Sequence, residues 1–173
     1  THRYFTFTDG TEVRVHFSPT DDGEHRVLLP LIYSARKGDI LRISMFGGGG
    51  YELVRALQSA AARGADVRIV LDNLTGSGMY SWWKDANANV LEKNFFTPSP
   101  LGQIELRKNN WPGLNHHKTA TLTRDLGQGQ MKVETLVVGS QNWSQTGNDL
   151  NDENMIAIRN TQKELKVMTA FND

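Results

Sequence analysis

The chain has 173 residues, the size of one ordinary domain with a real hydrophobic core. Nineteen Lys and Arg residues balance nineteen Asp and Glu residues, so no overall field attracts nucleic acid or an anionic membrane. The absence of cysteine excludes disulfides and thiolate chemistry, and no apolar run approaches the ~20 residues of a membrane span, so we expect no stable membrane insertion.

The first predicted elements are a strand and a helix. Val13, Val15 and Phe17 alternate with polar residues, which is the period of a half-buried strand. Apolar residues then recur at helical spacing over residues 27–35, and Gly38 follows as a C-terminal cap. Pro30 leaves the start of this helix open.

A crossover unit comes next. Residues 40–46 and 67–71 are apolar strands, and residues 51–63 between them form an amphipathic helix that Gly64 closes. A strand, a helix and a strand in this order form a right-handed crossover with parallel strands. The predicted fold class is therefore α/β, with a mixed, largely parallel β-sheet flanked by helices.

The second half is less regular. Prolines break residues 74–112 into loops around a weak helix at 82–93 and a short strand at 103–106. Alternation returns at His116, and the Gly-rich turn 124–130 joins it to a returning strand at 131–138. A strand is expected at 154–158. Thr161-x-x-Glu164 is a capping-box pattern that predicts a final helix with Leu165, Met168 and Phe171 facing inward.

Candidate chemistry begins in the segment Leu114-Asn-His-His-Lys-Thr-Ala-Thr-Leu122. Side chains alternate along a strand, so His116 and Lys118 share one face and His117 points to the other. The adjacent histidines therefore cannot chelate one metal ion. An H-x-K triplet by itself is more often a solvated strand end than a site.

The partner strand supplies polar groups at the same end. It ends in Gly139-Ser140-Gln-Asn142, whose hydroxyl and carboxamide suit an oxyanion. Glu153 opens the next strand and is the candidate to bind the second nitrogen of His116 and fix its tautomer. A polar turn before a strand is the alternative interpretation of Glu153.

These residues resemble a known family. H-x-K followed by G-S-x-N is similar to the signature of the phospholipase D superfamily, and the Glu of Asn-Asp-Glu153-Asn resembles the acidic residue of its small bacterial endonuclease members. Phe-Ser-Pro at 17–19, the passage over 35–46 and residues 56–72 also resemble one lobe of that family. The resemblance implies that residues 1–173 form a single phospholipase D-like α/β/α catalytic lobe.

One part of the signature differs. Thr123 stands where counting forward from Lys118 would place the family's aspartate, and Lys132 stands there when counting back from Gly139. The hairpin loop is longer than the family pattern by about nine residues, as judged from this resemblance. Asp125 is the nearest carboxylate, either a substrate-binding group or a loop residue without a role.

The resemblance implies covalent catalysis. His116 would attack phosphorus and form a phosphohistidine, while Lys118 and Asn142 stabilise the phosphoryl oxygens. Glu153 completes the expected catalytic set. The expected substrate-binding residues are Ser140, Asp125 and Trp143. Neither a metal ion nor a cofactor is expected, so activity should resist chelators.

A second histidine must protonate the leaving group, and the sequence contains no second H-x-K. His2, His16 and His25 lie in other contexts and are more often surface groups. We therefore expect a second H-x-K lobe, either in the same parent chain or in a homodimer partner. Because the chain begins at Thr1 and stops just after an expected helix, we expect it to be a fragment of a longer or two-lobe chain.

Three functions follow from these features. The favoured one is a phosphodiesterase that cleaves or transfers a phosphodiester, most readily of a phospholipid. The second is a metal-independent endonuclease of the same superfamily, against which the zero net charge weighs. The third is a non-catalytic lobe. The sequence does not indicate the compartment.

Overall fold

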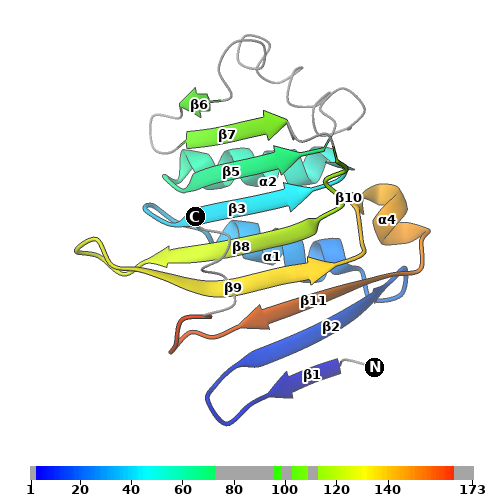
Figure 1. Ribbon diagram of the computed structural model, residues 1–173, viewed down its shortest axis with the longest axis horizontal. Helices are drawn as coiled ribbons and strands as arrows, with labels where there is room; N and C mark the ends of the chain where they lie inside the picture. Colours follow the sequence, from blue (N-terminus) through cyan, green and yellow to red (C-terminus); the bar gives the residue numbers. More distant parts are fainter. Residues whose placement is uncertain (1–2, 73–95, 99–102, 109–112, 166–173) are drawn as a thin grey trace.

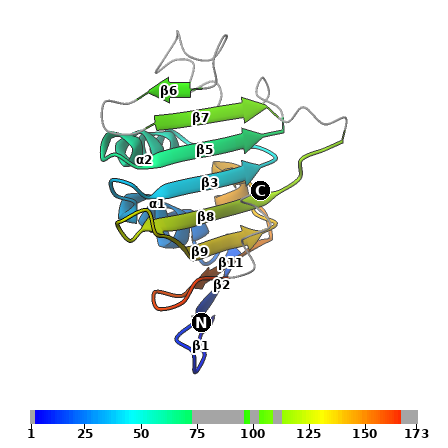
Figure 2. The ribbon, with the colours of Figure 1, turned by 60° about the vertical axis from the view of Figure 1, so that its left-hand side comes forward.

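The computed structural model describes residues 3–72, 96–98, 103–108 and 113–165, which form a large mixed sheet with helices on one face (Figures 1 and 2). In this part of the chain nine strands follow the order β1-β2-β11-β9-β8-β3-β5-β7-β6. Their bounds are β1 (Arg3–Thr6), β2 (Glu12–Ser18), β3 (Ile40–Met45), β5 (Asp66–Leu71), β6 (Phe96–Pro98), β7 (Gln103–Lys108), β8 (Lys118–Asp125), β9 (Met131–Gly139) and β11 (Glu153–Arg159). A second, two-stranded sheet pairs β4 (Gly48–Gly49) with β10 (Trp143–Ser144).

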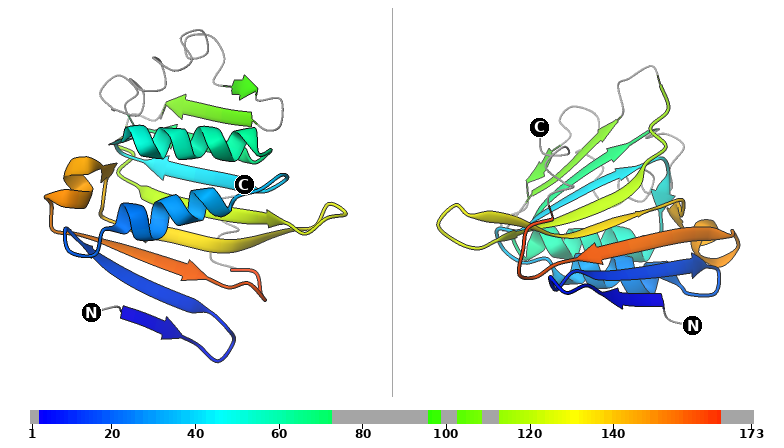
Figure 3. Two further views of the ribbon diagram at one scale, coloured as in Figure 1. Left: turned by 180° about the vertical axis from the view of Figure 1, so that it is seen from behind. Right: turned by 60° about the horizontal axis from the view of Figure 1, so that its bottom comes forward.

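The helices are the π-helix η1 (Glu24–Leu28), α1 (Leu29–Ser34), α2 (Tyr51–Ala62) and the short α4 (Gln145–Asp149). Seen from behind, α1 and α2 lie along the strands and cover one face of the large sheet, while α4 lies at the ends of the strands (Figure 3). The α/β class is confirmed, and the helix expected over 82–93 lies outside the described residues.

The sheet is mixed, but its parallel part is smaller than predicted. Among the described strands of the large sheet, β3 pairs with β5 and β5 with β7 in parallel, and the other neighbours are antiparallel. The reason is local. β8 and β9 form a hairpin and β8 lies antiparallel to β3, so the crossover pattern of the first half does not continue.

The main core lies between α1, α2 and the sheet. Leu41, Ile43 and Met45 of β3 alternate with less buried residues, and Leu53 and Leu57 of α2 pack in the same cluster. Fully burying each such side chain contributes about 1.5–3 kcal/mol, which fixes the register of β3 against the helices. The predicted cap at Gly64 is confirmed, because Gly64 follows α2 with a positive φ and donates its N–H to the Ala61 carbonyl. The predicted cap at Gly38 was wrong, because α1 already ends at Ser34 with an extended Ala35.

Two predicted boundaries need correction. The strand expected from His116 begins at Lys118. Residues 161–165 form a bend instead of a helix: Asn160 Oδ1 accepts the backbone N–H groups of Gln162 (2.8 Å) and Lys163 (2.7 Å), but the Leu165 N–H then donates to the Val133 carbonyl of β9 at 3.1 Å. The helix start predicted at Thr161 was therefore wrong, and Met168 and Phe171 lie outside the described residues.

The β8–β9 hairpin contains a β-bulge. Leu122 pairs with Thr135 while Thr123 pairs with Val133, so Glu134 is an extra residue between them. A bulge places two successive residues on similar sides of a strand. Glu134 is buried as a result, and its carboxylate accepts hydrogen bonds from Arg124 Nη2 (3.3 Å) and Arg159 Nε (3.2 Å).

Candidate active site

Five of the predicted site residues come to one end of the strands, where four strands begin or end: His116, Lys118, Ser140, Asn142 and Glu153. β3 and β9 end where β8 and β11 begin, with Met45 opposite Lys118 and Gly139 opposite Met155. The small β4–β10 sheet lies at this end (Figure 1). The glycine run at 47–50 thus contributes a paired strand to the surroundings of the site.

Lys118 is the buried cation of the site. It is 3% exposed, and its Nζ donates a hydrogen bond to the backbone carbonyl of His116 at 2.9 Å. Burial lowers the pKa of Lys118, and the negative charge of Glu153 partly opposes this shift. An ammonium has three N–H donors, so this single hydrogen bond leaves donors for a ligand.

Phe46 brings His116 and Lys118 into one site. The exposed His116 ring lies 5.0 Å from the Phe46 ring, centroid to centroid, at an interplanar angle of 50°. The Lys118 Nζ lies 5.1 Å from the centroid of the same ring. Phe46 also donates its backbone N–H to the His117 carbonyl at 2.8 Å, which continues the pairing of β3 and β8 past the end of β3 and before the start of β8.

Asn115 holds the backbone that leads into His116. Its N–H donates to Asp72 Oδ1 at 2.6 Å, and its carboxamide lies 3.3 Å from Ser44 Oγ. Asn115 Oδ1 also accepts the His117 N–H at 3.3 Å. These contacts connect the ends of β3 and β5 with the H-x-K segment, and sequence reasoning did not identify them.

The G-S-x-N segment lies beside β11. Ser140 Oγ accepts the Asn154 N–H at 3.0 Å, so this hydroxyl is already engaged with the backbone. Asn142 Oδ1 is buried and has no hydrogen-bond partner among the described residues. The O and N atoms of a carboxamide are assigned from their surroundings and can be exchanged by a flip of the group. In either assignment, one buried polar atom of Asn142 lacks a hydrogen-bond partner among the described residues.

Glu153 lies near the cation instead of bonding the imidazole. It is half-buried at the start of β11, and its Oε1 accepts a hydrogen bond from Asn151 Nδ2 at 3.3 Å. Its charge acts on Lys118. Within the ranges that the structure covers, no hydrogen bond joins Glu153 to His116, so the proposed fixing of the tautomer has no contact to support it here.

Two expected substrate-binding residues lie elsewhere. Trp143 is 1% exposed and packs in the main core, where it is inaccessible to a substrate. Asp125 ends β8, at the opposite end of the strand from Lys118. Its N–H donates to Asp39 Oδ1 (3.0 Å) and its Oδ1 accepts the Gly127 N–H (2.7 Å), so it stabilises the hairpin. Neither residue belongs at the site.

Neither of the residues at the family's aspartate position reaches the site. Thr123 is buried within β8, and its Oγ1 accepts a hydrogen bond from Arg42 Nη1 at 3.5 Å. Lys132, on the far half of β9, donates to the Thr161 carbonyl. Thr123 and Lys132, the two residues that the predicted signature spacing offers for this position, therefore both form contacts outside the site.

Two general features concern the described residues as a whole. Among them, no three His, Asp or Glu side chains come together in a way that could hold a metal ion. Their helices are also too short or too polar to cross a bilayer.

Comparisons with known proteins concern the family and the fold of the chain. A family model described as the phospholipase D-like domain of cardiolipin synthase matches residues 28–173. No curated protein matches the sequence significantly.

Several solved structures share the fold. Nuc from Salmonella typhimurium, described as a phospholipase D family member, has a TM-score of 0.65 at 24% identity over 94% of this chain and 90% of its own. NucT from Helicobacter pylori has a TM-score of 0.64 at 20% identity over 94% of both chains. Phosphatidylserine synthase from Haemophilus influenzae has a TM-score of 0.61 at 13% identity, over 93% of this chain and 37% of its own. At these identities the structures show a common fold, while the family model covers most of the sequence, and on that ground the chain belongs to the phospholipase D superfamily.

Proposed function

We propose that this protein is a phosphodiesterase that works through a phosphohistidine at His116. The observation that carries the proposal is the shared contact of the His116 ring and the Lys118 ammonium with Phe46. A nucleophile and a cation over one spot are what in-line attack on a phosphoryl group requires. Asn142, whose buried Oδ1 has no hydrogen-bond partner among the described residues, supplies a further polar group just beyond β9.

The reaction has two displacements. In the first, an unprotonated ring nitrogen of His116 forms a bond to phosphorus while the bond to the leaving oxygen breaks, and an acid protonates that oxygen. In the second, water or an alcohol attacks phosphorus and gives up its proton, and the bond to His116 breaks. Lys118 and Asn142 stabilise the charge that collects on the non-bridging oxygens in both steps.

The acid of this reaction comes from outside the described residues of one lobe. His25 is held by Asp22 Oδ1 at 2.9 Å and Glu52 Oε2 at 3.4 Å, and His16 lies on β2. Neither neighbours Lys118 in the sheet. We therefore propose that a second H-x-K lobe, in a parent chain or a homodimer partner, supplies the second imidazole.

The favoured substrate is a phospholipid, with hydrolysis or transfer of its phosphatidyl group. The proposal is supported by the family description, which names cardiolipin synthase, and by the fold shared with a phosphatidylserine synthase. Nucleic acid is the second candidate, because the segment around Glu153 resembles the small bacterial endonucleases of the superfamily.

A substrate panel tests these proposals. Purified protein, alone and with any second lobe of its parent chain, is given phosphatidylglycerol, phosphatidylcholine and single-stranded DNA, each with and without EDTA. We expect turnover of a phospholipid that EDTA does not abolish. Cleavage of DNA alone would replace the phospholipid by nucleic acid, and turnover of no phosphodiester would favour the non-catalytic lobe.

A further inference from the structure

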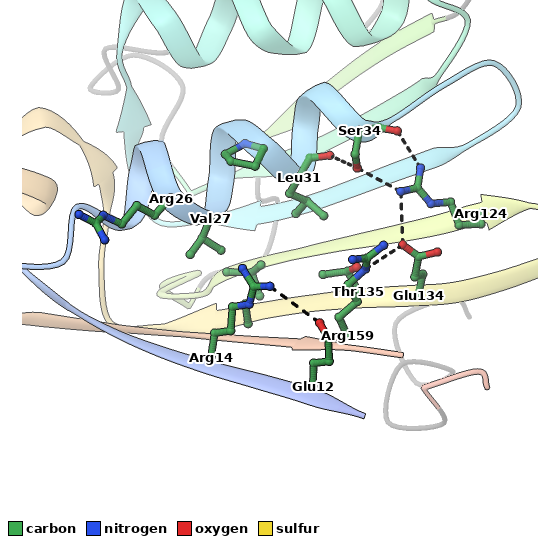
Figure 4. A pocket seen from close by; sticks show the side chains of 13 residues that line it. Glu12, Arg14, Arg26, Val27, Leu31, Ser34, Arg124, Glu134, Thr135 and Arg159 are labelled. Atoms are coloured by element: carbon green, nitrogen blue, oxygen red, sulfur yellow. Dashed lines mark hydrogen bonds and ion pairs between the residues drawn. The ribbon is translucent and has the colours of Figure 1, made fainter. Parts of the chain in front are cut away.

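A cavity lies between the helices and the edge strands, away from the candidate active site. It has a volume of about 180 Å³, opens to solvent on one side, and is lined by residues of η1, α1, β2, β8, β9 and β11 (Figure 4). A cavity of roughly 150 Å³ in a protein core is large enough to bind benzene. This cavity therefore has room for a small ligand or for part of a larger one.

One side of the cavity is apolar. Val27 and Leu31 reach down from the helices towards the strands, as Figure 4 shows, and Val137 and Ala157 contribute from the sheet. A water molecule forms few hydrogen bonds with such apolar side chains. A hydrocarbon chain, by contrast, is stabilised by about 25 cal/mol per Å² of apolar area that it buries there. This side suits a short apolar chain.

The other side is rich in guanidinium groups. Arg14, Arg26, Arg124 and Arg159 all line the cavity. Arg124 is fully engaged, because it donates to Asp39 Oδ2 at 2.6 Å, to the Ser34 carbonyl at 2.8 Å and to Glu134. These contacts hold the Arg124 side chain in place as part of the cavity lining, so it is not available to bind a ligand.

Arg14 and Arg26 are the guanidinium groups available to a ligand. Arg14 reaches Glu12 only at 3.9 Å, and both side chains are solvated, so this ion pair is weak. The Arg26 side chain has no hydrogen bond or ion pair within the described part of the chain. Both arginines also line an adjoining hollow of about 520 Å³, so they lie between this hollow and the cavity.

A half-buried histidine lines the adjoining hollow. Among the described residues the Nε2 atom of His16 is buried without a hydrogen-bond partner. A buried ring nitrogen that lacks a partner costs free energy. This atom is an unsatisfied polar group at the hollow that is independent of the arginines.

We propose that this cavity binds an oxyanion that carries a short apolar chain, such as an alkyl phosphate. The chain lies against Val27, Leu31 and Ala157, and the anionic group lies at the junction between Arg14 and Arg26, beside His16. Guanidinium groups bind phosphate and carboxylate oxygens with short, charge-assisted hydrogen bonds. The site does not depend on the phosphodiesterase proposed above.

Calorimetric titration with three matched probes tests the ligand class. Hexyl phosphate has both the head group and the chain, inorganic phosphate has the head group alone, and hexanol has the chain alone. We expect hexyl phosphate to bind at least about tenfold more tightly than either partial probe, since each part contributes more than ~1.4 kcal/mol. Equal affinity for inorganic phosphate, or no binding of hexyl phosphate at millimolar concentration, would overturn the proposal.

Variants locate the site. Arg14→Gln should weaken hexyl phosphate binding about tenfold, because one charged hydrogen-bond donor is lost. Lys37→Gln, which removes a charge from an exposed position outside the cavity, should leave binding unchanged. His116→Ala should also bind normally. Binding that survives Arg14→Gln in correctly folded protein but is lost in His116→Ala would assign the ligand to the candidate active site and contradict the proposal.

Discussion

Phe46 is expected to position both groups of the site, since its ring contacts the His116 imidazole and the Lys118 ammonium. Phe46→Leu removes a cation–π contact worth ~0.5–2 kcal/mol and frees the imidazole to rotate, so kcat/KM should fall about tenfold. Phe46→Tyr keeps the ring and should retain most activity. Steady-state kinetics of both variants measure the effect, and equal activity of the Leu variant and the wild type would show that Phe46 only packs.

Glu153 should control the alkaline side of the pH profile. Its negative charge raises the pKa of Lys118 against the larger, lowering effect of burial. Glu153→Gln removes that charge, so Lys118 should lose its proton at lower pH and the alkaline limb of kcat/KM should move down. If the acidic limb alone moved, Glu153 would be acting on the imidazole.

The site residues proposed from the sequence lie in short motifs, whereas contacts that act across the fold have no such signal. His116, Lys118, Ser140, Asn142 and Glu153 lie at or next to the ends of strands that the sequence predicts. The hydrogen bond from Asn115 to Asp72, by contrast, joins residues 43 positions apart and has no local pattern. Trp143 was predicted to bind substrate but is buried in the core. Strand alternation gives the face of a side chain, but it does not show whether that face borders a core or a groove.

At the scale of elements, the regular strands and α2 were predictable because their apolar periodicity is strong. The π-helix η1, the β4–β10 pair and α4 were not, since each is short and depends on contacts with distant segments. The hairpin was predicted, but its bulge was not. That bulge matters because it buries Glu134 against Arg124.

Glu134 provides a stability test for this element. Burial alone would raise the pKa of Glu134, but the hydrogen bond and charge of Arg124, together with Arg159, lower it below the ordinary 4.5. A lowered folded-state pKa stabilises the fold above the unfolded pKa, and this stability is lost as pH falls through the folded value. Glu134→Gln should therefore unfold ~1–3 kcal/mol more easily at pH 7, with a smaller difference well below pH 4.5, in urea titrations. A constant difference across this range would contradict the charge-based role.

At the scale of the whole molecule, one lobe offers one H-x-K, so the working site is proposed to be composite. If two copies of this chain supply the two imidazoles, specific activity should rise with protein concentration over the range in which dimers form. Sedimentation velocity at the assay concentrations provides the comparison. Full activity in a strictly monomeric sample of this chain would exclude the composite site.

The exposed edge of the sheet bears on the same question. Strands β1 and β2 carry the exposed aromatic side chains of Phe5 and Phe17, which are 56% and 40% exposed. Large apolar groups gathered at one part of a surface favour contact with another polypeptide. Both a second lobe and a second copy are compatible with this surface.

Detection of the covalent intermediate on His116 tests the proposed mechanism most directly. Protein that contains both lobes is mixed with a phosphodiester substrate, quenched in alkali within one turnover and digested for mass spectrometry. A substrate-derived phosphoryl group on His116, absent in His116→Ala and present in His117→Ala, is the expected result. Turnover without any phosphoryl group on His116, or with the group on His117, would contradict the assignment of the nucleophile.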